Sequence, residues 1–339
     1  MICYIQSYLG RLFLLISLSF IYSCNQDNST TSTTTSQEDA EIVSSLIVPQ
    51  FNADSAYFFI KKQVDCGPRV PGTSGHKQCE QLLTSYLERF SANLIIQKTD
   101  VKIYDGSKVP MRNFIAEFNP EKKNRIMLCA HWDTRPFADQ DKTNRDQPID
   151  GANDGASGVG VLLEIARQLS QNSPQVGIDI ILFDVEDYGQ PDNTGLAPRA
   201  DSWCLGSQYW SKNLHKKNYF PLYGILLDMV GGKDATFTME GNSMKFAPSV
   251  MKKVWNAAAQ NGYSSNFHFE ETNPIIDDHV YINKLAGIPC IDIVHYDHDT
   301  PSNFGKFWHT HNDNMDIIDK KVLKAVGQTL LEVIFKENA

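Results

Sequence analysis

Acidic residues and histidines follow the apolar runs of this chain. The runs, each with the residues that come after it, are 125–130 with His131, 178–183 with Glu186 and Asp187, 223–227 with Asp228, and 288–293 with Trp308 and His309. Two further acids, Asp154 and Asp277, stand at the start of helical stretches. Carboxylates that gather at one place repel one another unless a cation lies among them. Because oxygen and imidazole ligands suit Zn²⁺, and three of them leave one position open, the pattern predicts a catalytic metal site.

The elements that must position these residues alternate along the chain. Helical periodicity predicts helices at 53–64, 75–90, 155–169, 249–260, 277–285 and 319–336. Extended apolar runs predict strands at 94–96, 113–116, 125–130, 178–183, 223–227 and 288–293. Apolar runs between helices indicate strands that are buried on both faces of a mostly parallel sheet. Since function gathers beyond the carboxyl ends of such strands, this α/β arrangement is expected to bring the acids and histidines together.

Each of these residues also has an ordinary structural explanation when it is taken alone. His131 could be a hydrogen-bonded residue at a strand end, and Asp228 could serve a turn. Asp154 and Asp277 could cap helices, and Glu186 could belong to a solvated loop. The joint pattern favours the metal site, because the acids gather at the same end of different strands.

The first 45 residues do not belong to the predicted domain. Arg11 precedes the apolar run 12–20, which suits a signal peptide of residues 1–23 and is too short to span a bilayer. Ile21–Cys24 resembles a bacterial lipobox, so residues 24–45 are expected to be a lipidated Cys24 and a flexible, Ser/Thr-rich tether. The alternatives are ordinary signal cleavage, or a short anchor in which Cys24 is incidental. We therefore expect an exported, periplasmic or cell-envelope lipoprotein of a bacterium, with a single catalytic domain at 46–339.

Composition and cysteine usage narrow the class of protein further. The formal net charge is −9 and no block of basic residues occurs, whereas a nucleic-acid-binding surface needs clustered Lys and Arg. Five cysteines lie beyond Cys24, and no CxxC pair is among them. Export permits disulfides, but the odd and scattered set Cys66, Cys79, Cys129, Cys204 and Cys290 does not predict one. Cys129 and Cys290 lie in apolar runs and are expected to be small core residues.

Four motifs give the chain a specific resemblance. They are Gly151–Gly158 (GANDGASG), Phe183–Asp187 (FDVED), Asp277–His279 (DDH) and Trp308–Thr310 (WHT). In these motifs the chain resembles the M28-type zinc exopeptidases, and among them the glutaminyl cyclases (glutaminyl-peptide cyclotransferases) of the bacterial, animal-like form. The resemblance covers nearly all of the predicted domain. It implies a three-layer αβα fold with a central, mostly parallel mixed sheet, and one Zn²⁺ per monomer.

The resemblance also implies an activity and a role for each matching residue. The activity is closure of an N-terminal glutamine of peptides or proteins into pyroglutamate, with release of ammonia. By role, the matching residues are the zinc ligands Asp154, Asp187 and His309, the general acid/base Glu186, the assisting acids Asp228 and Asp277, the pocket residue Trp308, and His131 at a position that ligates a second metal in aminopeptidases.

Three departures from the family pattern concern the site. Asp187 stands where animal cyclases carry the longer Glu. The stretch 188–202 is longer than in those enzymes and has no match to their second pocket tryptophan, so Trp203 is either its substitute or a core residue. Cys129 is one position away from a cysteine that forms a disulfide beside the site in animal enzymes.

Two other functions remain open from the sequence. A two-zinc aminopeptidase would need five positions, and all are filled, by His131, Asp154, Asp187, Asp228 and His309. Trp308 and the DDH motif favour the cyclase, because both mark its pocket and its acid network. The remaining alternative is a binding protein that has lost its chemistry, but such relatives lose ligands or the base and this chain retains them all. The physiological peptides and the oligomeric state are not determined by the sequence.

Overall fold

Six strands form the central sheet of the protein, for which we use a computed structural model that describes residues 47–191, 194–199 and 201–338. The strands are β1 (Asn93–Lys102), β2 (Lys108–Phe118), β3 (Arg125–His131), β4 (Gly177–Phe183), β5 (Tyr223–Asp228) and β8 (Cys290–Val294). Their order in the sheet is β1-β2-β4-β3-β5-β8. The pairs β1–β2 and β2–β4 are antiparallel, and the other three pairs are parallel. The predicted mostly parallel, mixed sheet is therefore confirmed.

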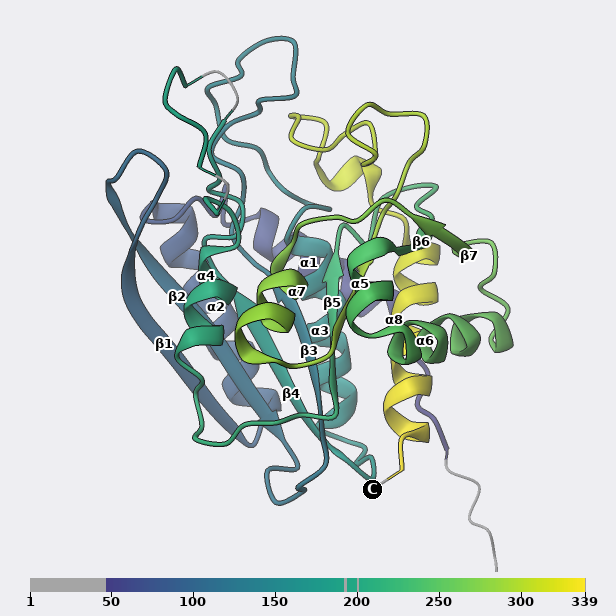
Figure 1. The fold of residues 1–339 in the computed structure, drawn as a ribbon. Helices are drawn as coiled ribbons and strands as arrows, with labels where there is room; N and C mark the ends of the chain where they lie inside the picture. The colour runs from purple at the N-terminus through teal and green to yellow at the C-terminus, as the bar shows by residue number, and fades with distance from the viewer. Residues whose placement is uncertain (1–46, 192–193, 200, 339) are drawn as a thin grey trace, which may run out of the picture. The chain divides into compact units, whose positions relative to one another are not determined.

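Helices cover both faces of this sheet (Figure 1). One face packs against α1 (Ala53–Val64), α2 (Ser74–Phe90), α3 (Ala156–Leu169), α6 (Pro248–Gln260) and α8 (Lys320–Lys336). The other face packs against α4 (Leu205–Lys212) and the π-helical turn Ile282–Ala286, which follows α7 (Asp278–Tyr281). A short helix, α5 (Gly241–Phe246), and the two-stranded sheet of β6 (Phe237–Glu240) and β7 (Phe267–Thr272) lie beside β8. The three-layer arrangement agrees with the expected fold class.

The alternation of side chains along β3 explains how one short strand supports two layers. Ile126 and Leu128 belong to the larger core cluster under α1, α3 and α8. Met127 and Cys129 belong to the smaller cluster on the other face, with Trp210 of α4. All four β3 side chains are fully buried, and burial of a side chain such as Leu or Ile is worth about 1.5–3 kcal/mol. Because both faces are covered, the strand is apolar from Ile126 to Ala130, and the sequence alone predicted it.

The predicted helices agree closely with the structure, with one difference. The predicted helix 277–285 divides into α7 and the π-helical turn Ile282–Ala286. The Asn283 side chain donates to the carbonyl oxygens of both His279 and Cys290, at 2.8 and 2.7 Å, and so ties the turn to the start of β8. The sequence missed α4, α5, β6 and β7. These elements have between four and eight residues, too few for a periodic signal.

The predictions for the N-terminal region concern residues that the structure does not describe. The signal peptide 1–23, the lipidated Cys24 and the tether up to residue 45 all lie outside the described residues. Within the described ranges, no helix has both the length and the apolar character needed to cross a membrane. The five cysteines from Cys66 to Cys290 are free thiols, and Cys129 and Cys290 are fully buried, as expected of core residues.

A buried ion pair at the amino ends of β3 and β4 should contribute strongly to stability. Asp179 accepts two hydrogen bonds from the Arg125 guanidinium, at 2.8 and 2.6 Å, and a third from the Tyr219 hydroxyl at 2.9 Å. Asp179→Asn removes the charge that neutralises Arg125 and leaves the guanidinium only carbonyl acceptors, so we expect a loss of about 3–5 kcal/mol in the free energy of unfolding. Urea unfolding would measure it.

The exposed pair Lys61–Asp65 on α1 provides the control. These two side chains are 54% and 45% exposed, so Asp65→Asn should change the free energy of unfolding by less than about 1 kcal/mol. An Asp179→Asn protein no less stable than the Asp65→Asn protein would contradict the prediction.

Candidate active site

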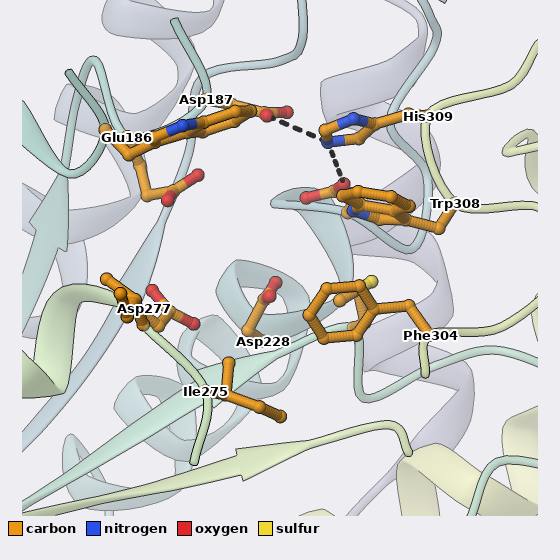
Figure 2. Close-up of a pocket in the computed structure, with 12 residues that line it drawn as sticks. Glu186, Asp187, Asp228, Ile275, Asp277, Phe304, Trp308 and His309 are labelled. Carbon is orange, nitrogen blue, oxygen red and sulfur yellow. Dashed lines mark ion pairs between the residues drawn. The ribbon is translucent and has the colours of Figure 1, made fainter. Parts of the chain in front are cut away.

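The carboxyl ends of the parallel strands bring the predicted site residues together. His131 is the last residue of β3 and Asp228 the last of β5, while Glu186 and Asp187 follow the end of β4. Asp154 lies just before α3, and the long loop after β8 carries His309. Figure 2 shows the labelled acids and His309 arranged around one open space. The expectation that they would meet at this edge of the sheet agrees with the structure.

Asp154, Asp187 and His309 lie close enough to share one ion. His309 Nε2 is 3.2 Å from Asp187 Oδ1 and 3.7 Å from Asp154 Oδ2, the two contacts drawn as dashed lines in Figure 2. One ligand atom from each of the three residues lies within 4.8 Å of the other two. All three residues are buried. The shorter Asp187 therefore reaches the imidazole despite having one methylene fewer than Glu.

The chemistry of this group fits a divalent cation. Asp187 Oδ2 is buried and has no hydrogen-bond partner among the described residues. Burial and the neighbouring charge of Asp154 raise the pKa of Asp187 to about 6, so two carboxylates are held together at an energetic cost. A cation bound by oxygens of both carboxylates and by the imidazole nitrogen would remove this cost. Two carboxylates and one histidine are a ligand set that suits Zn²⁺.

Outer partners orient the three candidate ligands. His309 Nδ1 is 3.0 Å from Asp139 Oδ1, which directs the other ring nitrogen toward Asp154 and Asp187. Asp139 also pairs with Arg135, whose guanidinium donates to the Asp187 carbonyl oxygen at 2.9 Å. Burial raises the pKa of Asp139, but the hydrogen bonds from His309 and Arg135 outweigh burial and hold that pKa well below its usual range. The sequence missed Asp139, because it lies in a polar loop without periodicity.

Two other carboxylates fix the backbone at the candidate ligands. Asp133 accepts from the backbone N–H groups of Glu186 and Asp187, at 3.0 and 3.2 Å. Asp313 does the same for Asn153 and Asp154, at 2.7 and 3.0 Å. Neither was identified as a site residue from the sequence. Asp133 and Asp313 accept hydrogen bonds from backbone N–H groups that neither a β-sheet nor a helix would pair in these loops.

Strained backbone appears where the strands deliver these side chains. Val185, just before Glu186, has a φ of 55°, and His309 has a φ of 53°. A β-branched residue in the left-handed region is a genuine outlier, at a cost of about 1–3 kcal/mol. Such strain persists only where the surroundings enforce it, here through Asp133 and the bond from Leu205 N–H to the Val185 carbonyl at 3.0 Å.

Gly155 explains why Asp154 faces the site rather than capping α3. Gly155 itself is the N-cap, with a φ of 86°. A Cβ at this position would lie 2.7 Å from the Asp133 carbonyl oxygen and 3.1 Å from the His131 ring. The simple helix-cap explanation of Asp154 is therefore wrong. For Asp277 it is correct in part, because its side chain accepts from the Asp278 N–H while the residue also lines the cavity.

A second group of possible ligands shares Asp154. His131 Nε2 lies 3.0 Å from Asp154 Oδ1 and 3.2 Å from Asp228 Oδ1. One ligand atom from each of these three residues lies within 4.8 Å of the others. The geometry therefore contains the five positions that a two-metal site would use.

Glu186 is the acid whose surroundings most favour proton transfer. Burial raises its pKa well above the ordinary value, and the charges of Asp277 and Asp187 raise it further while His131 opposes them. Burial is thus the first cause, ahead of the predicted crowding by acids. The Cys204 thiol, which the sequence did not single out, donates to Glu186 Oε1 at 3.2 Å. Burial, Asp154 and Asp277 raise the pKa of Asp228 to about 7.

Aromatic and aliphatic side chains form the walls of a cavity of about 290 Å³ in front of these acids. The Trp308 indole stacks on His309 with ring centres 3.8 Å apart, and Trp203 stacks on the same ring at 5.9 Å. Trp203 lines the cavity, so of the two alternatives for this residue the structure favours the pocket wall over the core. Phe304 and Ile275, which the sequence missed, face the acids across the cavity (Figure 2).

The αβα fold, with acids and histidines at the carboxyl edge of its sheet, defines a metallo-exopeptidase type of protein. Comparison with known families agrees with this class. The model of peptidase family M28 matches residues 113–334, and the chain belongs to this family.

Three solved structures that are similar to this chain are a glutaminyl cyclase, a zinc-dependent exopeptidase and a protein described as an aminopeptidase precursor. A glutaminyl cyclase of Bacteroides thetaiotaomicron, solved with N-acetylhistamine, is 53% identical with a TM-score of 0.84, over 86% of this chain and 100% of its own. A Zn-dependent exopeptidase of Parabacteroides distasonis is 50% identical, with the same TM-score and coverage. A structure from Bacteroides thetaiotaomicron described as a leucine aminopeptidase precursor is 53% identical with a TM-score of 0.83, over 86% of this chain and 99% of its own.

Neutralising one candidate ligand should separate metal binding from folding. The pKa of Asp187 in the metal-free fold is about 6, above the ordinary 3.8, so its ionised form opposes folding once the pH exceeds the lower value. At pH 8 without metal, Asp187→Asn should therefore raise the melting temperature. Zinc at a thousand times its Kd should stabilise the original protein by about 4 kcal/mol and the variant far less. Thermal unfolding with zinc or with a chelator would show both effects.

Asp228→Asn is the matched control, since its pKa is also raised, to about 7, and it lies outside the trio. It should give a similar gain without metal. Because Asp228 could contribute only to a second metal site with His131 and Asp154, the variant should keep the gain that the first equivalent of zinc produces. Equal zinc responses of the Asp187→Asn and original proteins would contradict the assignment of the trio.

Proposed function

We propose that this protein is a glutaminyl-peptide cyclotransferase that converts the N-terminal glutamine of peptides or proteins into pyroglutamate and releases ammonia. One zinc per molecule would be held by Asp154, Asp187 and His309. The observation that carries the proposal is the position of the Glu186 carboxyl, whose side chain is only 13% exposed, at an aromatic-walled cavity beside that trio. The glutaminyl cyclase with half of its residues identical to this chain supports it.

Bound zinc would polarise the γ-amide carbonyl group of the substrate as a Lewis acid. Glu186 would accept a proton from the α-amino nitrogen while that nitrogen bonds to the γ-amide carbon. The same carboxyl group would then give this proton to the departing amide nitrogen, which leaves as ammonia when its bond to carbon breaks. No water is consumed, so the sum of pyroglutamyl product and ammonia equals the substrate. A base with a raised pKa suits both transfers near neutral pH.

Asp228 and Asp277 would act on the nitrogen side of the reaction. Burial raises the pKa of both acids, and the charge of Asp277 also raises the pKa of Asp228 and of Glu186. Protons shared among the three groups would let them accept hydrogen bonds from the substrate amine and donate to the forming ammonia. The facing arrangement of their carboxyl groups in Figure 2 supports this role.

The walls of the cavity would select glutamine by size. Its volume of about 290 Å³ is at the lower end of small-molecule sites, which begin at about 300 Å³. Trp308, Phe304 and Ile275 offer an apolar surface to the two side-chain methylenes, each worth about 0.8 kcal/mol when buried. Trp203 would close the wall beside His309.

The second candidate is a two-metal aminopeptidase. The group of His131, Asp154 and Asp228 favours it, because these residues could hold a second ion. The similar structure described as a leucine aminopeptidase precursor points the same way. An inert binding protein is disfavoured, because ligands, base and cavity are all retained.

A comparison of two peptides tests the choice between the two activities. The purified protein, loaded with zinc, is incubated with a Gln-initiated dipeptide and with the matching Leu-initiated dipeptide. We expect ammonia release from the first and no free leucine from the second, since cyclisation needs a γ-amide. Leucine release without ammonia would establish the aminopeptidase instead.

Glu186→Gln supplies the control for chemistry against binding. The variant should keep zinc and its fold but lose ammonia release by on the order of 10²–10⁴-fold, which is the usual contribution of a general acid/base. Turnover at the original rate would remove Glu186 from the mechanism.

We also propose that Cys24 anchors the protein to the bacterial cell envelope, on the support of the apolar run 12–20 and the lipobox-like Ile21–Cys24. Cys24→Ser should release the protein from the membrane fraction and abolish incorporation of labelled palmitate. Palmitate incorporation that persists in this variant would contradict the anchor.

A further inference from the structure

Glu240 is a wholly buried carboxylate outside the cavity, and the proposed mechanism does not use it. It is the last residue of β6 and has no exposed surface. It caps α5, accepting from the backbone N–H groups of Asn242, at 2.8 Å, and Ser243. A buried charge costs folding energy unless it is fully paired, so the Glu240 carboxylate needs partners besides these two N–H groups.

Those partners lie at both ends of the segment that carries Asp277. Glu240 Oε2 accepts from the Ile275 N–H at 3.0 Å. Glu240 Oε1 lies 3.0 Å from His279 Nε2, and neither side chain is exposed. His279 Nε2 has no hydrogen-bond partner among the described residues, so its contact with Glu240 is electrostatic. One carboxylate therefore hydrogen-bonds residue 275 and contacts residue 279, with Asp277 midway between them.

The other interactions near Asp277 lie at the α7 end of the segment, where the Asn283 side chain donates to the His279 carbonyl oxygen and His279 Nδ1 is 3.7 Å from Asp292. Residues 273–276 lie between β7 and α7 without regular structure. The Asn242 side chain donates to the Ile275 carbonyl oxygen at 2.6 Å, and Asn242 itself is held by Glu240. Both carboxyl oxygens of Asp278 are buried without a hydrogen-bond partner among the described residues. The Glu240 carboxylate is thus the common anchor of the segment.

Charge strengthens this anchor. Burial raises the pKa of Glu240, but the adjacent His279 and the hydrogen bond from Ser243 outweigh it and lower the pKa to about 2. The carboxylate is therefore ionised at neutral pH. Hydrogen bonds to an ionised acceptor are shorter and about twice as strong as neutral ones.

We propose that Glu240 and His279 are positioning residues that hold Asp277 against the reacting groups. They touch neither substrate nor metal ligand and act on the rate through Asp277 alone. This inference rests on the proposed function, in which Asp277 belongs to the acid network. The proposal also gives the small β6–β7 sheet a role, since Glu240 is the last residue of β6.

Glu240→Gln tests the proposal at nearly constant volume. One oxygen accepts from Ser243 N–H and the other from Asn242 and Ile275 N–H, so the new amide NH₂ group must face a backbone donor wherever it lies. We expect kcat for the Gln-initiated dipeptide to fall on the order of tenfold to a hundredfold, the cost of displacing a catalytic group by about 1 Å. KM should change far less than kcat.

Glu164→Gln is the matched control. Glu164 is also fully buried, pairs with Arg167 at 2.6 Å and accepts from the Asn52 N–H at 3.2 Å, but it lies on α3 away from the cavity. It should lose stability as Glu240→Gln does and retain the original kcat. Equal loss of kcat in the two variants would overturn the proposal, as would an unchanged kcat in Glu240→Gln.

A double variant tests whether the effect passes through Asp277. Added to Asp277→Asn, Glu240→Gln should lower the residual kcat no further, because coupled residues are not additive; multiplied losses would overturn the proposal. If Glu240→Gln does not fold, His279→Gln replaces it, since this variant leaves the cap of α5 intact and removes only the contact with α7.

The original protein is measured in the same assay. Failure of that protein to release ammonia would contradict the proposed function, whereas the variant comparisons address the positioning role.

Discussion

The repulsion among buried carboxylates at one edge of the sheet is the constraint on which the rest of this structure depends. Asp154, Asp187, Glu186 and Asp228 converge there, and burial together with their mutual charges raises the pKa of three of them. His131 and His309 offset only part of this charge. A divalent cation would neutralise the remainder, so the convergence of these side chains indicates a metal site.

Other carboxylates hold the candidate ligands in place through hydrogen bonds. Asp139 orients the His309 ring, while Asp133 and Asp313 satisfy the backbone donors beside the acidic ligands. Our proposal for Glu240 extends the same device to Asp277. In each case a buried acid accepts hydrogen bonds from a loop that has no ladder of its own, so the loop acquires the rigidity that a reaction geometry needs.

The ligand set by itself does not distinguish cyclisation from hydrolysis. His131, Asp154 and Asp228 could hold a second ion, as a hydrolase would require. The difference lies in the cavity, where Trp308 stacks on His309 and forms an apolar wall beside the candidate ligands. A substrate whose own amine attacks its own side chain needs a tight enclosure more than it needs an activated water.

The sequence by itself determined the α/β class and the position of most strands and helices, because strands buried on both faces are continuously apolar. It also showed acids and histidines near the strand ends, and the resemblance in four motifs assigned three of them as zinc ligands. It could not reveal Asp139, Asp313 or Glu240, and it left Trp203 open between pocket and core. Each of these residues lies in a loop or a very short element, and its partner is far away in the chain: Asp139 contacts a histidine 170 positions later. Local periodicity carries no information about such contacts. They were decided only when the sheet brought the loops of separate strands to one edge.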